Sequence, residues 1–200
     1  MIAVITTPRA ALRWTRLKKQ VPDAVPVIAL PLDHPEVVTY AAKYHRPLQE
    51  VSHRLTLARI LMSMEGDSIT VLEDDTVFDT VPDFSPVDGI DFQVYGTYIR
   101  RVPEAERISA LWVRLLKPLP MWGSHAVLYS RKGAERMVTE MREGRCMPDA
   151  WIGQQARVGL RTPMVAWQMD DVPGMHGKFR FGELRRQAEY FMGKGKYNKG

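Results

Sequence analysis

Three consecutive carboxylates, Glu73, Asp74 and Asp75, follow directly after the β-rich run 68–72. Negative charges crowded at a buried strand end repel one another at a low effective dielectric, and a bound cation would neutralise them. Oxygen ligands select Mg²⁺ or Mn²⁺, which proteins hold with one or two carboxylates and the phosphate oxygens of a substrate. Because side chains alternate along a strand, we expect Glu73 and Asp75 on the metal side and Asp74 on the other. Acidic turn residues that only cap a strand are the alternative.

The segments that must position this triplet have the pattern of an α/β protein. Apolar runs at 2–7 and 25–32 predict strands, and the stretch 9–20 between them predicts a helix, which is the spacing of a βαβ unit with a parallel sheet. A core-facing helix is predicted over 47–62, directly before the strand that carries the triplet. Other predicted elements are strands at 91–98, 126–129 and 163–169, helices at 134–142 and 149–158, and a loop at 100–107.

Several segments, in order and with matching spacing over residues 2–152, resemble motifs of glycosyltransferase family 25, the lipooligosaccharide and collagen galactosyltransferase type. The acidic triplet resembles the DXD-like motif of that family, and an arginine pair follows the first strand. A Ser-His helical segment, a Gly-Ser-His-Ala segment leading into a helix start, and an Asp-Ala-Trp segment are also similar. The matching residues are Arg9 with Arg13, VSHRL at 51–55, ITVLEDDTVF at 69–78, GSHAVLYSRKGA at 123–134 and PDAW at 148–151.

The resemblance implies a GT-A fold, a Rossmann-like α/β/α sandwich with a mostly parallel central sheet that binds a nucleotide sugar at the C-terminal ends of its strands. Residues 1–177 would form this glycosyltransferase domain, and residues 178–200 a basic C-terminal tail. The implied reaction transfers a hexose, expected to come from a UDP-linked donor, to an acceptor hydroxyl with inversion and with Mn²⁺ or Mg²⁺ as cofactor. The family suggests a surface saccharide as the acceptor, whereas the compact size and the basic tail fit a phosphate-rich acceptor such as a hydroxylated base in phage DNA.

Each candidate residue then has an expected role. Glu73, Asp75 and His176 would hold the metal, a Lewis acid that stabilises the departing nucleoside diphosphate. Asp149, in the Asp-Ala-Trp segment, would be the base that deprotonates the acceptor hydroxyl. The expected acceptor or sugar contacts are Trp122, Gly123 and Trp151. The expected donor-binding residues are Thr6, Thr7, Arg9, Arg13, Asp33 and Asp74.

Most of these roles have a structural alternative. Arg13 could lie on a solvated helix face, Asp33 in a turn and His176 in a plain loop. Either tryptophan could pack in the core instead of facing a sugar. His53 and His125, which lie within the matching segments 51–55 and 123–134, are expected to be packed rather than catalytic.

The composition is that of an ordinary globular domain, with 45% hydrophobic and 26% charged residues in a chain of 200, and it excludes a disordered or collagen-like chain. The single cysteine, Cys146, excludes an intrachain disulfide and a cysteine-based zinc site. The apolar run 2–5 is too short for a signal peptide or a membrane span. We therefore expect a cytoplasmic protein without a transmembrane segment. Peripheral attachment to a membrane surface and, if the protein is phage-encoded, the host-cell cytoplasm are the alternatives.

The net charge of +5 is concentrated near the C-terminus. Residues 171–200 contain seven Lys or Arg and three acidic residues, a net charge of +4, which leaves +1 for the other 170. This asymmetry predicts an anionic partner near the tail, such as a saccharide or modified DNA, or else a solvated tail that aids solubility. The oligomeric state does not follow from the sequence.

Two rival functions share the acidic cluster or the basic tail. A metal-dependent nuclease or phosphatase also needs clustered carboxylates, but it usually recruits additional separated Asp, Glu and His motifs, which this sequence lacks. A non-catalytic nucleic-acid-binding module would use the basic tail, and the acidic strand end would weaken its binding.

Overall fold

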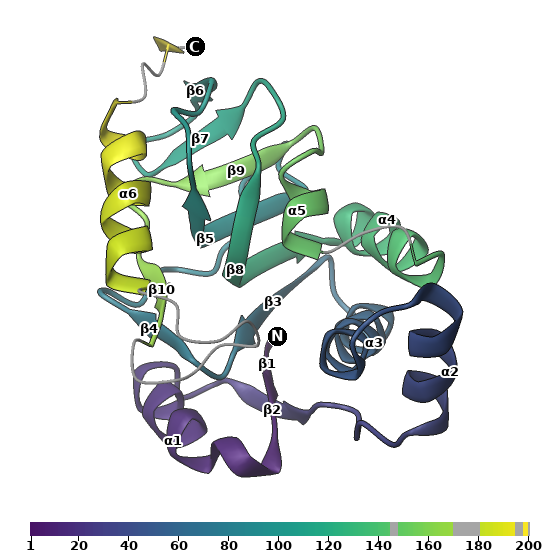
Figure 1. The fold of residues 1–200 in the computed structure, drawn as a ribbon. Coiled ribbons are helices and arrows are strands. Elements are labelled where there is room, and N and C mark those ends of the chain that lie inside the picture. The colour runs from purple at the N-terminus through teal and green to yellow at the C-terminus, as the bar shows by residue number, and fades with distance from the viewer. Residues whose placement is uncertain (145–147, 170–180, 195–197, 200) are drawn as a thin grey trace.

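A single large sheet forms the centre of the computed structural model, which describes residues 1–144, 148–169, 181–194 and 198–199 (Figure 1). Its strand order is β11-β6-β7-β9-β5-β8-β3-β1-β2, and β4 and β10 form a separate two-stranded ribbon. The strands are β1 (Ile2–Thr6), β2 (Val25–Ile28), β3 (Ser68–Glu73), β4 (Thr76–Phe78), β5 (Phe92–Ile99), β6 (Ala105–Arg107), β7 (Trp112–Leu115), β8 (Met121–Ser130), β9 (Val158–Arg161), β10 (Ala166–Gln168) and β11 (Asn198–Lys199).

Helices cover both faces of this sheet, as expected for an α/β/α sandwich. Alternation along β1 shows the two cores: Ala3 and Ile5 join the core under α3, α4 and α6, whereas Val4 packs with Leu17 of α1 on the other face. The helices are η1 (Pro8–Ala10), α1 (Ala11–Gln20), α2 (Pro35–Tyr44), α3 (Leu48–Met62), α4 (Arg131–Arg142), α5 (Pro148–Ile152) and α6 (Phe181–Lys194). None of the described helices is long and apolar enough to cross a membrane.

The sheet is mixed rather than mostly parallel. The N-terminal strands β2, β1 and β3 are parallel, as the βαβ spacing predicts. Beyond them, β8 is antiparallel to both β3 and β5, and β7 is antiparallel to both β9 and β6. A parallel neighbour requires a crossover connection, usually through a helix, but between β5 and β8 the chain forms the short strands β6 and β7 instead. Parallel pairs occur there too, between β5 and β9 and between β6 and β11, so the expected mostly parallel arrangement holds only for the strands β2, β1 and β3.

Several local predictions need correction. The loop predicted at 100–107 contains β6. The helix predicted at 149–158 ends at Ile152, because the backbone of Gly153 lies against Leu119 and accepts its N–H at 2.7 Å. The strand predicted at 163–169 is reduced to the three residues of β10.

The C-terminal segment expected to be a basic tail, 178–200, contains α6. This helix packs on β5 and places Ala188 and Met192 in the core, with Leu184 and Phe191 packed against it. These four apolar residues recur at spacings of four, three and one, so they form one face of the helix. The basic residues are therefore interleaved with a core-forming stripe, which the charge count alone did not indicate.

Candidate functional site

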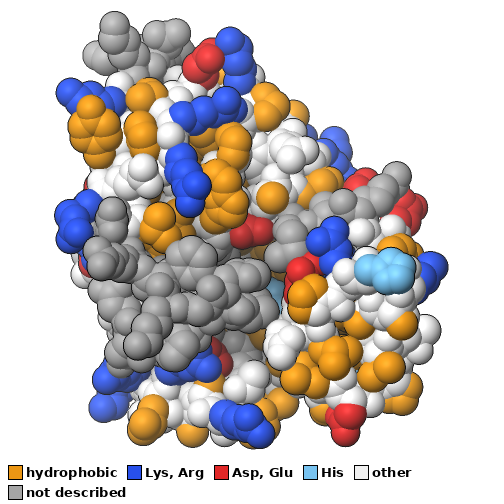
Figure 2. All heavy atoms as spheres, viewed as in Figure 1, with side chains coloured by type: hydrophobic (Ala, Val, Ile, Leu, Met, Phe, Trp, Pro, Cys, Tyr) orange, Lys and Arg blue, Asp and Glu red, His pale blue; other side chains and the backbone are white. Residues whose placement is uncertain are grey.

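A cavity of about 560 Å³ opens where the C-terminal ends of β1 and β3 meet β8, α3 and α5. Ile5 and Glu73 are opposite each other in the parallel β1–β3 register, so both strands end at this place. Figure 2 shows this face of the molecule hollowed near its middle, with an acidic and a histidine side chain at depth and hydrophobic and basic side chains around them. In an open α/β sheet, the carboxyl ends of the strands are the usual place for a ligand.

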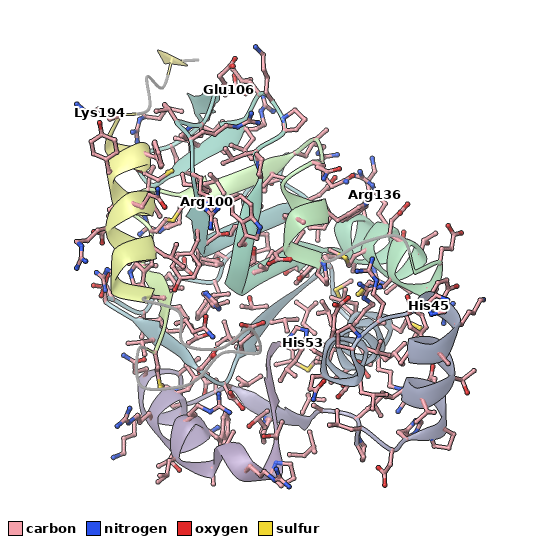
Figure 3. All side chains as sticks on the ribbon, viewed as in Figure 1. His45, His53, Arg100, Glu106, Arg136 and Lys194 are labelled. Carbon is pink, nitrogen blue, oxygen red and sulfur yellow. The ribbon has the colours of Figure 1, made fainter. Side chains whose placement is uncertain are left out.

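Glu73, the last residue of β3, is held between two histidines. Its Oε1 lies 3.2 Å from Nε2 of His53 on α3, and its Oε2 lies 2.9 Å from Nδ1 of His125 on β8. Figure 3 shows His53 on α3, beside the end of β3. The β3–β8 pairing sets the second contact, because Leu72 is opposite Ala126 and His125 therefore falls beside Glu73.

These contacts control the ionisation of all three groups. Burial would raise the pKa of Glu73, but the hydrogen bonds and charges of His125 and His53 lower it well below its ordinary value. Burial would lower the pKa of each histidine, but Glu73, with Asp75 and Asp149 nearby, raises both. In the metal-free protein, an ionised carboxylate is therefore flanked by two imidazoles that favour the protonated form.

Asp75 is buried beside this group. Its Oδ2 accepts a hydrogen bond of 2.5 Å from Nε2 of Gln168, and its backbone oxygen accepts the N–H of Met169. The β4–β10 ribbon supplies both contacts, because Gln168 is opposite Thr76. Its other oxygen, Oδ1, has no hydrogen-bond partner in the described part of the chain. Burial and the charge of Glu73 raise the pKa of Asp75 above its ordinary value.

Glu73, Asp75 and His125 together have the chemistry of a divalent-metal site. Each offers one ligand atom, and these atoms lie within 4.8 Å of one another. Two carboxylates and an imidazole form a donor set that divalent cations accept. The unpaired Oδ1 of Asp75 and the raised pKa of its carboxyl both fit a group whose charge a cation would balance. His176, the third ligand expected from the sequence, lies outside the described residues.

Asp74 points away from this group, as strand alternation predicts. Its Oδ1 lies 3.3 Å from Nη1 of Arg13 on α1. Burial raises the pKa of Asp74, although the hydrogen bond from Thr6 and the charge of Arg13 act in the opposite direction. Arg13 is therefore paired with an acid rather than lying on a freely solvated helix face.

Asp149, at the start of α5, lines the cavity together with Trp122 and Gly123. Its Oδ2 accepts the N–H of Gly123 at 2.7 Å, and its Oδ1 accepts the N–H of Ala150 at 3.0 Å. Gly123 has a φ of +62°, and a β-carbon there would lie 2.8 Å from the ring of His125. A glycine at 123 therefore leaves room on β8 for both the Asp149 carboxylate and the ring of His125.

Other predicted site residues lie apart from the cavity. Thr6 is buried at the end of β1, whereas Thr7, Arg9 and Asp33 are exposed, and none of them is among the described residues that line it. Trp151 does not line it either. Its ring packs edge-to-face on Phe92, at 5.6 Å between ring centroids and 90° between planes. Trp151 is therefore a partly buried residue packed against the core.

The sequence analysis missed the roles of His53, His125 and Gln168. Both histidines are packed, as predicted, but they pack on Glu73 and line the cavity. A signal was present, because both lie in segments that resemble the glycosyltransferase motifs, 51–55 and 123–134. Nothing comparable marked Gln168, whose contact depends on the pairing of β10 with β4.

Comparison with known proteins identifies no family. No family model and no curated protein matches the chain. Among solved structures, A197 from STIV is similar over 85% of each chain, with 13% identity and a TM-score of 0.48. A glycosyltransferase involved in glycosylation of the major capsid of PBCV-1 is similar over 70% of this chain and 64% of that chain, with 9% identity and a TM-score of 0.35. Membership of family 25 thus stays a prediction.

Proposed function

We propose that this protein is a metal-dependent glycosyltransferase that moves a hexose from a nucleotide sugar, expected to be UDP-linked, to an acceptor hydroxyl. The observation that carries this proposal is the cluster of Glu73, Asp75 and His125, which stands where parallel strands end and beside a cavity that also contains Asp149. The cavity, of about 560 Å³, has the size of a small-molecule site. A metal group and a separate carboxylate are the two chemical functions that this transfer needs.

The cluster would hold Mn²⁺ or Mg²⁺. When bound, the ion would supply positive charge to the diphosphate that leaves the donor sugar. His53 and Gln168 each hold one carboxylate of the cluster, the former contacting Glu73 and the latter Asp75. Such supporting contacts fix the orientation of metal-binding side chains, so that their oxygens stay directed at the ion. His176 remains a proposed further ligand.

Asp149 is the proposed base. Two backbone N–H groups fix its carboxylate, and the oxygen lone pairs that they do not use can take the proton of an acceptor hydroxyl in the cavity. Trp122, which is 42% exposed, would offer its face to the acceptor. The acceptor class, a saccharide or a hydroxylated base in DNA, is part of the proposal that the next subsection refines.

The donor nucleotide is proposed to lie on the β1 side of the cluster. Thr6 ends β1, Thr7 follows it, and Asp33 lies in the segment after β2, on the side of the sheet where the base and ribose would bind. Arg9 and the Arg13–Asp74 pair lie on the same side, at η1 and α1. Their guanidinium groups are suited to phosphate oxygens.

Donor hydrolysis tests this proposal. Purified protein is incubated with Mn²⁺ or Mg²⁺ and a panel of nucleotide sugars, and the released nucleotide is identified. We expect nucleoside diphosphate from one donor, loss of the signal with a chelator and in Asp75→Asn, and an unchanged signal in Asp67→Asn, an exposed carboxylate at the other end of β3. Release of nucleoside monophosphate, or hydrolysis of simple phosphate esters, would instead identify a nuclease or phosphatase.

A further inference from the structure

The walls of the cavity carry opposite charges in different places. Glu73 and Asp149 lie with the histidines, whereas Arg46 and Arg100 contribute guanidinium groups from outside the metal cluster. Arg46 lies two residues before α3 and Arg100 directly follows β5, so two separate parts of the chain supply the cations. Figure 3 shows Arg100 beside the upper part of β8, apart from His53 on α3.

Arg100 is positioned by an aromatic ring rather than by an acid. Its guanidinium carbon lies 5.0 Å from the centre of the Trp122 ring. No acidic side chain in the described part of the chain pairs with it. Stacking orients the planar guanidinium but leaves its N–H donors available, and such a group binds a phosphate or carboxylate through two parallel hydrogen bonds.

Arg46 is only partly neutralised. Its Nη1 lies 3.9 Å from Oε1 of Glu50, and the same oxygen lies 2.9 Å from Nη2 of the fully buried Arg54. One carboxylate is therefore shared by two guanidinium groups, and the closer contact belongs to Arg54. The remaining positive charge is on Arg46, which lines the cavity.

We infer that the acceptor is a phosphorylated sugar, whose phosphate is bound by Arg100 while its ring contacts Trp122 and its hydroxyl reaches Asp149, with Arg46 adding positive charge to the same cavity. This inference rests on the proposed function, because a metal at Glu73 and Asp75 would already balance the diphosphate of the donor. The two arginines are thus available for a second anion in the same cavity. They also place acceptor recognition within the cavity rather than on the C-terminal segment 178–200.

Calorimetric titration tests the inference with three probes: glucose 6-phosphate, glucose and inorganic phosphate, each with and without saturating UDP and Mn²⁺. We expect glucose 6-phosphate to bind more tightly than either other probe and to remain bound when the donor site is filled. Arg100→Gln should weaken that binding about tenfold, the size expected for one charge-assisted contact, and Arg46→Gln should weaken it in the same direction. Thermal melts confirm that each variant is folded.

The neighbouring Arg101→Gln is the matched control. Arg101 is exposed, donates to the backbone oxygen of Pro118 and does not line the cavity, so its replacement should not change the affinity for glucose 6-phosphate. Equal losses of affinity in Arg100→Gln and Arg101→Gln would overturn the inference. An affinity for glucose 6-phosphate no higher than that for inorganic phosphate would also overturn it. Displacement by UDP and Mn²⁺, with a matching loss of UDP affinity in Arg100→Gln, would assign Arg100 to the donor and also overturn it.

The same data separate this inference from the proposed function. If UDP and nucleotide sugars fail to bind with any metal, the glycosyltransferase proposal fails. Binding of glucose 6-phosphate that depends on Arg100 would still establish the phosphate site in that case. If UDP binds with Mn²⁺ but glucose 6-phosphate does not bind, only the inference about the acceptor is lost.

Discussion

Glu73 and Asp149 are two carboxylates whose surroundings suit different tasks. Glu73 lies between two imidazoles, which lower its pKa strongly and leave it a poor acceptor of protons. Asp149 is held by backbone N–H groups at the start of a short helix, with no imidazole in hydrogen-bond contact among the described residues. Separate environments for neighbouring carboxylates are how one site provides both a charged ligand and a base.

Asp149→Asn should reduce turnover by about 10²-fold or more while changing donor affinity little. The amide oxygen can still accept the N–H of Gly123, so the local structure should survive, but the group can no longer take a proton. Steady-state rates with the donor identified by the hydrolysis panel, together with UDP affinity, measure the two effects. Comparable turnover in wild type and variant would place the base elsewhere.

The carboxylates of the candidate metal site, Glu73 and Asp75, were predictable from the sequence, but its histidine was not. Alternation at the end of a strand correctly placed Glu73 and Asp75 on one side and Asp74 on the other. His125 joins them only because β8 pairs antiparallel with β3 in one register. No local pattern encodes a register between segments more than fifty residues apart, so this part of the site follows from tertiary structure alone.

At the scale of elements, β8 connects the metal group to the proposed base. Gly123→Ala should disturb both, because a β-carbon at a φ of +62° would be strained and would lie 2.8 Å from the ring of His125, which Glu73 holds in place. We expect a loss of about 1–2 kcal/mol from the backbone conformation, and also the loss of metal-dependent stabilisation. Thermal melts with and without Mn²⁺ measure both.

Gly89→Ala separates the two effects. Gly89 has a φ of +77°, and a β-carbon there would meet no atom within 4 Å, so this variant should lose a similar amount of stability while keeping its full response to Mn²⁺. Identical metal responses in the two variants would show that His125 does not need the space that Gly123 provides.

The strength of local patterns determined which elements were predictable. β1, β3 and α3 have apolar runs or stripes that the core uses directly, and the sequence identified all three. β6 and β7 are strands of three and four residues that include charged side chains, so no alternation distinguishes them from a loop. In α6, basic residues hid the stripe that contacts β5.

Ala188→Leu tests whether α6 is part of the core. Ala188 is fully buried on the helix, so a larger side chain should overpack the contact and cost about 1–3 kcal/mol. The control Gln187→Leu introduces the same side chain at the exposed neighbouring position. It should change the free energy of unfolding by no more than about 0.5 kcal/mol. Urea denaturation compares them, and equal effects would mean that α6 does not pack on the sheet in solution.

For the whole molecule, the cavity lies where the parallel part of the sheet meets the mixed part. Its walls come from segments that span the chain, from Ile5 on β1 to Leu184 on α6. A ligand in this cavity contacts both the parallel and the mixed part of the sheet. It therefore binds the folded state and not the unfolded chain. Its binding free energy therefore stabilises the entire fold rather than one local element.

Mn²⁺ and UDP together should consequently raise the melting temperature more than either does alone. At a ligand concentration one hundred times the dissociation constant, the gain is about 2.7 kcal/mol. For a chain of this size, that gain corresponds to about 5–10 °C.

In Asp75→Asn the joint shift should vanish, because an amide is a far poorer ligand for a hard divalent ion than a carboxylate. The melting temperature of the metal-free variant should be unchanged or higher, since one buried charge beside Glu73 has been removed. A joint shift that survives in Asp75→Asn would exclude this carboxylate from the metal site, whereas a drop in metal-free stability would give it a structural role instead.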